Sequence, residues 1–141
     1  MKQSVSSLAL TLILLLVPLS AWSAVDNLLP KPRILSMVDG TYALPQTVRL
    51  YDPTGCPMLR AFVEENGCRM KTVGKPRRAT LTVELVADIP QTKDYHLAGF
   101  DNEAYRLRVT GSGIHISAVT PTGVFRAAAT LMQLADDGGG R

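Results

Sequence analysis

The acidic residues could act as general acids or bases, but their spacing does not assemble a site. The chain has 12 Asp and Glu among 141 residues. The acidic pairs fall late in a predicted helix, around a turn and after the last predicted helix, namely Glu64 and Glu65, Asp101 and Glu103, and Asp136 and Asp137. Because acidic residues are mostly found on protein surfaces, we expect each pair to be solvated.

Histidine and serine offer no catalytic arrangement either. His96 falls in an irregular stretch, and His115 stands between two isoleucines on the polar face of a predicted strand. No Cys or His spacing is typical of a zinc site. The G-x-S-x-G motif is absent, and Gly111-Ser112-Gly113 precedes a strand, whereas a phosphate loop opens onto a helix. The sequence therefore predicts no catalytic residue, metal or cofactor.

The two cysteines allow two interpretations. Cys56 and Cys68 flank a stretch in which Leu59, Phe62 and Val63 follow helical spacing. A helix of about ten residues spans roughly 15 Å, whereas a disulfide needs Cα atoms within about 7 Å. Two unbonded thiols are therefore favoured, and a disulfide between the two helix ends is the alternative.

The first 23 residues have the order of a secretory signal peptide. A lysine precedes the apolar run from Leu8 to Leu19, and Ala21 and Ser23 supply small residues at the cleavage positions. The run is short for a bilayer span and Pro18 interrupts it, so an uncleaved anchor is the less favoured alternative. We expect a secreted or periplasmic protein with a leader over 1–23, one domain over 24–137 and a tail over 138–141, and no membrane partner after cleavage.

The charge balance gives no indication of nucleic acid. The formal net charge is +3, and it falls to about +2 without the lysine of the leader. The basic segment 74–78, GKPRR, has no interleaved aromatic residue and reads as an ordinary exposed turn.

Alternation of apolar and polar residues predicts the strands. It is clean over 79–86, 103–110 and 114–119, and the last two segments flank a glycine-rich turn that makes them a hairpin. Weaker candidates are 33–37, 41–44, 47–51 and 68–73, and helical spacing occupies 55–66 and the C-terminal segment. These elements predict an α+β domain, with an antiparallel sheet and two helices packed on one face.

Two stretches and the order between them support a family resemblance. The stretch 27–44 is NLLPKPRILSMVDGTYAL, a Pro-x-Pro lead followed by a glycine turn. The stretch 103–134 is EAYRLRVTGSGIHISAVTPTGVFRAAATLMQL, a hairpin followed by a helix. With a strand, a helix and further strands between them, they resemble the N-terminal, non-catalytic domain of family 20 glycoside hydrolases, the beta-N-acetylhexosaminidases.

The resemblance implies a role without chemistry of its own. In the family this domain precedes a (β/α)₈ barrel whose adjacent Asp and Glu perform a substrate-assisted glycoside hydrolysis. This chain has no Asp-Glu dipeptide, and it is shorter than the roughly 250 residues of such a barrel. We therefore expect an exported domain that supports a barrel acting on terminal N-acetylhexosamine residues in glycans, and the barrel is the partner that this chain lacks.

The C-terminal helix predicted over 122–135 has few polar positions. Arg126, Thr130 and Gln133 are the polar residues of its interior, and they form one narrow stripe. A surface helix of a lone domain has an apolar stripe somewhat over about 100° wide. We therefore expect cover from two sides, with a barrel-facing surface formed by Val124, Phe125, Ala128, Leu131 and Met132. The alternative is that the alanines of this helix are good helix formers exposed to water.

Two further function classes stay open. A free-standing secreted module could bind glycans or a protein, although aromatic residues, which form sugar platforms, are 6% of the chain and Tyr95 and Tyr105 are the candidates. A small enzyme of another class would need a site that the sequence does not display.

Overall fold

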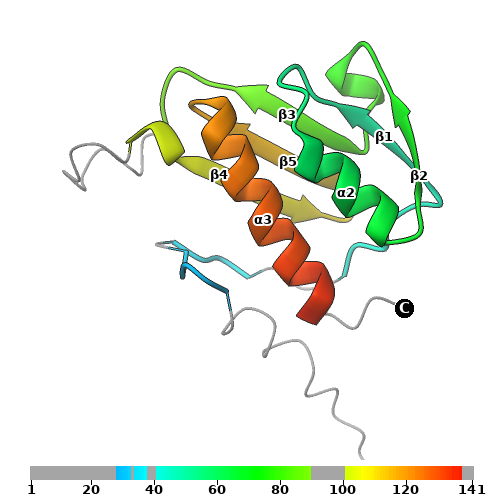
Figure 1. Ribbon diagram of the computed structural model, residues 1–141, viewed down its shortest axis with the longest axis horizontal. Helices are drawn as coiled ribbons and strands as arrows, with labels where there is room; N and C mark the ends of the chain where they lie inside the picture. Colours follow the sequence, from blue (N-terminus) through cyan, green and yellow to red (C-terminus); the bar gives the residue numbers. More distant parts are fainter. Residues whose placement is uncertain (1–27, 33, 38–40, 90–100, 138–141) are drawn as a thin grey trace, which may run out of the picture.

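The computed structural model describes residues 28–32, 34–37, 41–89 and 101–137. Five strands form one sheet, and two helices lie side by side across one of its faces (Figure 1). The elements in chain order are β1 (Thr47–Tyr51), α2 (Pro57–Glu65), β2 (Arg69–Thr72), the 3-10 turn η2 (Pro76–Arg78), β3 (Leu81–Leu85), the 3-10 turn η4 (Asp101–Glu103), β4 (Tyr105–Thr110), β5 (Gly113–Ala118) and α3 (Pro121–Asp137).

The sheet is mixed, so the prediction of an antiparallel sheet was wrong. Its strand order is β2-β1-β3-β5-β4. Strand β1 pairs in parallel with β2 and β3, and β3 pairs in parallel with β5, so that Leu50 lies opposite Leu81 and Leu81 lies opposite Ile114. Strands β4 and β5 form the antiparallel hairpin that was predicted. The two helices on one face also agree with the prediction.

The error has a physical cause. Alternation of apolar and polar residues along a strand indicates that one face of the sheet is buried. It does not indicate whether the neighbouring strand runs parallel or antiparallel. Here the helix between β1 and β2 decides that direction, because a helical crossover returns the chain parallel to the first strand. The weak candidates at 33–37 and 41–44 were also wrong over their described residues, which pair with no strand.

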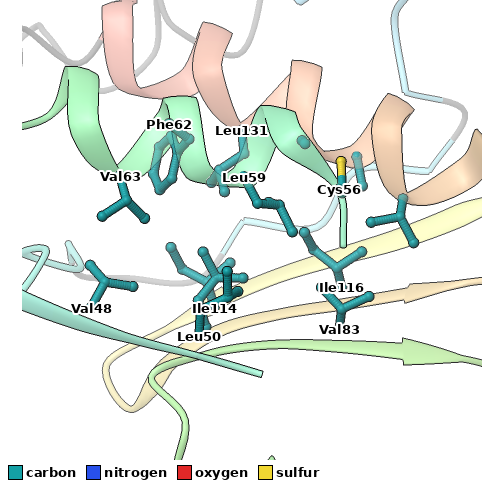
Figure 2. Close-up of a cluster of buried hydrophobic side chains, with 14 of the residues drawn as sticks. Val48, Leu50, Cys56, Leu59, Phe62, Val63, Val83, Ile114, Ile116 and Leu131 are labelled. Atoms are coloured by element: carbon teal, nitrogen blue, oxygen red, sulfur yellow. The ribbon is translucent and has the colours of Figure 1, made fainter. Parts of the chain in front are cut away.

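The core lies between the sheet and the two helices. Figure 2 shows Val48, Leu50, Val83, Ile114 and Ile116 of the sheet beneath the side chains of the helices. The helical residues labelled there are Leu59, Phe62 and Val63 from α2 and Leu131 from α3. Burying each such side chain contributes about 1.5–3 kcal/mol, so this layer supplies most of the stability.

The two cysteines are both free thiols. Cys56 is buried at the start of α2, and Cys68 is half-buried just before β2. This confirms the favoured interpretation of the sequence, in which the two thiols are not bonded to each other.

The carboxylate of Asp52 holds the chain where it enters α2. It accepts hydrogen bonds from the backbone N–H groups of Thr54 and Cys56 at 2.8 and 2.7 Å.

Helix α3 begins at a capped and closely packed end. The hydroxyl of Thr120 accepts a hydrogen bond from the backbone N–H of Gly123 at 3.3 Å and donates one to the carbonyl of Asn102, and Pro121 occupies the first helical position. A methyl carbon at Gly123 would lie 2.7 Å from the carbonyl oxygen of Ala104. Glycine is needed here because the helix approaches backbone that cannot easily move.

We therefore expect Gly123→Ala to destabilise the protein. The added methyl group would push α3 away from β4, at a cost of about 1–3 kcal/mol that exceeds the roughly 1 kcal/mol of helix propensity gained. The control is Gly111→Ala, because a methyl group at Gly111 meets no atom within 4 Å. Urea unfolding of both variants would measure the difference, and equal midpoints would contradict the packing account.

Candidate docking face

The polar stripe of α3 is used inside the domain. The guanidinium of Arg126 pairs with the carboxylate of Glu103 in η4 at 3.0 Å. The side chains of Thr130 and Tyr105 share a hydrogen bond of 2.7 Å between their hydroxyl oxygens. These two contacts direct Arg126 and Thr130 toward η4 and β4, and the Arg126 side chain keeps 50% of its surface exposed.

The third polar residue of the stripe bonds to the N-terminal lead-in, by which we mean residues 28–32 and 34–37. The side-chain amide of Gln133 accepts a hydrogen bond from the backbone N–H of Leu29 at 2.9 Å and donates one to the backbone carbonyl of Leu29 at 3.0 Å. The neighbouring Leu28 is buried. The lead-in is thereby held against the C-terminal half of α3, as the blue segment in Figure 1 shows.

The five residues predicted to face a barrel occupy different positions. Val124, Ala128 and Leu131 are buried in the domain's own core. Phe125 keeps 43% of its surface exposed, and Met132 is half-buried at the margin of the core. Within this set, Phe125 is therefore the large apolar side chain that remains available to another surface.

A second group of exposed apolar residues comes from the lead-in. Leu29, Ile34, Leu35 and Met37 are each more than half exposed. A strand predicted over 33–37 would have placed Ile34, Leu35 and Met37 in the sheet, so the sequence did not indicate this surface. We group these four residues with Phe125 and call the set the apolar docking face, because the hydrogen bonds between Leu29 and Gln133 place the lead-in on the helix that carries Phe125. Contiguous exposed apolar residues are typical of interaction surfaces.

The bond between Thr130 and Tyr105 gives a test of how α3 is oriented. Thr130 is 8% exposed, so Tyr105→Phe would leave its hydroxyl buried without this partner, at a cost of about 1–3 kcal/mol. We expect the double variant Tyr105→Phe/Thr130→Val to recover part of that loss, because neither polar group is then left buried alone. Unfolding free energies of the two single variants and the double variant measure the coupling, and strictly additive losses would show that the bond does not orient the helix.

The other candidate residues lie apart from one another. His115 is exposed on the sheet face opposite the helices, Glu64 pairs with Arg60 on α2 at 4.0 Å, and Asp136 is exposed near the end of α3. His96 and Tyr95 lie outside the described residues. In the described ranges, no three His, Cys, Asp or Glu side chains gather in a way that could hold a metal ion.

Tyr105 is not available as a platform for sugars. Its ring packs against the core, and its hydroxyl is bonded to Thr130. Among the described helices, none has both the length and the hydropathy needed to cross a membrane. The described chain thus offers exposed apolar side chains as a surface for docking.

The comparisons agree with this architecture. Residues 26–141 match the family model of glycosyl hydrolase family 20, domain 2. The chain belongs to this family. The crystal structure of a beta-N-acetylhexosaminidase from Bacteroides fragilis NCTC 9343 superimposes with a TM-score of 0.58 at 22% sequence identity. That likeness, at this identity, shows the fold alone. No curated protein matches the chain.

The lengths of the two proteins differ greatly. The superposition covers 74% of this chain and 20% of the Bacteroides chain, so the chain matches about a fifth of that protein's length. A non-catalytic domain of a glycoside hydrolase family is therefore the identity that the residues, the fold and the family model share.

Proposed function

We propose that this domain supports the catalytic barrel of an exported beta-N-acetylhexosaminidase, which hydrolyses terminal N-acetylhexosamine residues in glycans. The supporting observation is the combination of a domain 2 match over 26–141 with an apolar docking face on the helix side of the sheet. Such a barrel needs roughly 250 residues, more than the whole chain, so the barrel itself is not formed by these 141 residues.

The physical role would be to cover one side of the barrel. Enclosing the exposed part of the Phe125 ring alone would contribute roughly 2 kcal/mol. The lead-in adds four apolar side chains to the same task, and Gln133 fixes the place of the lead-in beside α3. The order at 1–23 of a lysine, an apolar run and small residues supports export.

A free-standing binding module is the second candidate, and the structure offers it less support. Neutral sugars bind best on exposed aromatic rings. Among the candidates, Tyr105 is engaged with Thr130, and Phe125 lies on the apolar docking face. The supporting role therefore accounts for more of the exposed surface.

We expect the chain without a barrel to self-associate, and Phe125→Ser to reduce that association. The ring is 43% exposed and otherwise covered, so its loss should lower the unfolding free energy by about 1–2 kcal/mol, less than the loss of a fully buried ring. Phe62→Ser is the matched control, because Phe62 is 1% exposed and its replacement should cost at least about 3 kcal/mol. Sedimentation velocity and urea unfolding measure both effects.

Two outcomes would contradict the supporting role. One is a strictly monomeric parent chain whose behaviour Phe125→Ser does not alter. The other is turnover of an aryl N-acetylglucosaminide by the purified chain alone, since no catalytic pair is expected in it.

A further inference from the structure

The sheet face turned away from the helices is basic at one edge. Strand alternation directs Arg49 of β1, together with Arg69 and Lys71 of β2, to this face, because the residues between them pack toward the core. The parallel register places Arg49 opposite Lys71. Adjacent strands lie about 4.8 Å apart, and alternate residues along a strand about 6.6 Å apart. The three charges therefore lie within reach of one ligand.

The segment after β2 brings three more cations to the same edge. Lys75, Arg77 and Arg78 are all exposed. Lys71, Lys75 and Arg78 line one open depression together with residues 72–74. We call the whole set the basic cluster, which comprises Arg49, Arg69, Lys71, Lys75, Arg77 and Arg78.

Backbone hydrogen bonds hold this segment in place against β1. The backbone N–H of Val73 donates to the carbonyl of Leu50 at 2.9 Å, and that of Thr80 donates to the carbonyl of Arg49 at 2.8 Å. The hydroxyl of Thr80 also accepts a hydrogen bond from the N–H of Arg49 at 2.9 Å. The cations are therefore presented by an ordered segment, which lowers the entropy lost when a ligand binds.

The cluster is not neutralised within the protein. In the described part of the chain, none of its six cations forms an ion pair, and the pairs seen there join Arg60 to Glu64 and Arg126 to Glu103. Like charges that face each other across two strands destabilise a sheet, as Arg49 and Lys71 do here. A bound anion would relieve this repulsion.

We propose that the basic cluster binds an anionic polysaccharide that bears sulfate or carboxylate groups along its chain. Four of the six cations are arginines, whose planar guanidinium groups suit bidentate contacts with such oxyanions. A polymer with repeated anions matches a set of cations spread over two strands and a loop. The choice of a glycan rests on the proposed function, because a domain that accompanies a glycan hydrolase meets glycans.

Other polyanions fit the cluster less well. Membrane surfaces are bound by cations that stand beside inserting apolar side chains. The apolar docking face belongs to the lead-in and α3, whereas the basic cluster belongs to β1, β2 and the segment that includes η2. Single-stranded nucleic acid is bound on aromatic rings, and no aromatic residue lines the depression.

The test measures binding of the full chain to chondroitin sulfate, with uncharged dextran as the reference polymer. Lys71→Ala/Lys75→Ala/Arg78→Ala removes three cations from the cluster, and Lys31→Ala/Arg60→Ala/Arg108→Ala removes three exposed cations elsewhere, so the two variants have equal net charge. We expect Kd to rise at least about tenfold for the cluster variant and no more than about twofold for the control. Affinity should fall steeply with salt, and less steeply for the cluster variant.

The variant Lys71→Arg/Lys75→Arg/Arg78→Lys changes the same three positions but keeps their charges, so it should retain the parent affinity. It separates the loss of charge from a general effect of substitution at these positions. Three results would overturn the proposal: no binding at about 0.05 M salt, equal losses in both alanine variants, or tighter binding to phosphatidylglycerol vesicles or duplex DNA than to chondroitin sulfate. No hydrolysis is measured, so failure of the barrel-supporting role would leave this result unchanged.

Discussion

Among the described residues, helices cover one face of the sheet only, and this arrangement constrains the rest of the domain. All five strands must direct their apolar side chains to the same side, and two helices must cover them. The longer helix, α3, can do this because the side chains that it turns toward the sheet are small. These side chains, Val124, Ala127 and Ala128, are fully buried, and Gly123 lets the first turn of the helix approach the backbone of Ala104. In this half of the core, the backbone of α3 lies close to its neighbours, so small side chains are enough to fill the space between them.

The same constraint determines which side of α3 remains outside. Its three polar residues are engaged by Glu103, Tyr105 and Leu29, all within the domain. The stripe meets η4, β4 and the lead-in, while Arg126 also stays exposed to water. Another side of the helix displays Phe125 with 43% of its surface exposed. Burial of Val124, Ala128 and Leu131 against the sheet orients the helix, and the polar contacts are consistent with that orientation.

From the sequence, the buried face of each strand could be predicted more readily than the parallel or antiparallel direction of neighbouring strands. Alternation along β3, β4 and β5 identified the buried residues, such as Val83, Leu107 and Ile116, because burial repeats every second residue. The helical spacing at 55–66 between two strand candidates could have indicated that β1 and β2 are parallel, whereas no local pattern encodes the pairing of β3 with the distant strands β1 and β5. The free thiols were predictable because a helix holds its two ends apart.

The candidate sites show the same division. The polar stripe of α3 was visible in the sequence, but its partners were not, because the chain folding back through Leu29 and Tyr105 supplies them. Three of the five residues expected on a docking face lie in the core instead, since a wide apolar arc does not reveal which part of it meets the sheet.

The distribution of charge is the clearest case of a property that exists only in three dimensions. A net charge of +3 is too small to suggest an anionic partner. Parallel pairing then brings Arg49 beside Lys71, and hydrogen bonds from the segment that includes η2 hold further cations next to them. An antiparallel pairing of these strands would have given Lys71 a different neighbour. One small domain thus carries exposed apolar side chains on α3 and the lead-in and a basic cluster at one edge of its open sheet face, because strand direction decides which charges meet and helix orientation decides which apolar groups stay uncovered.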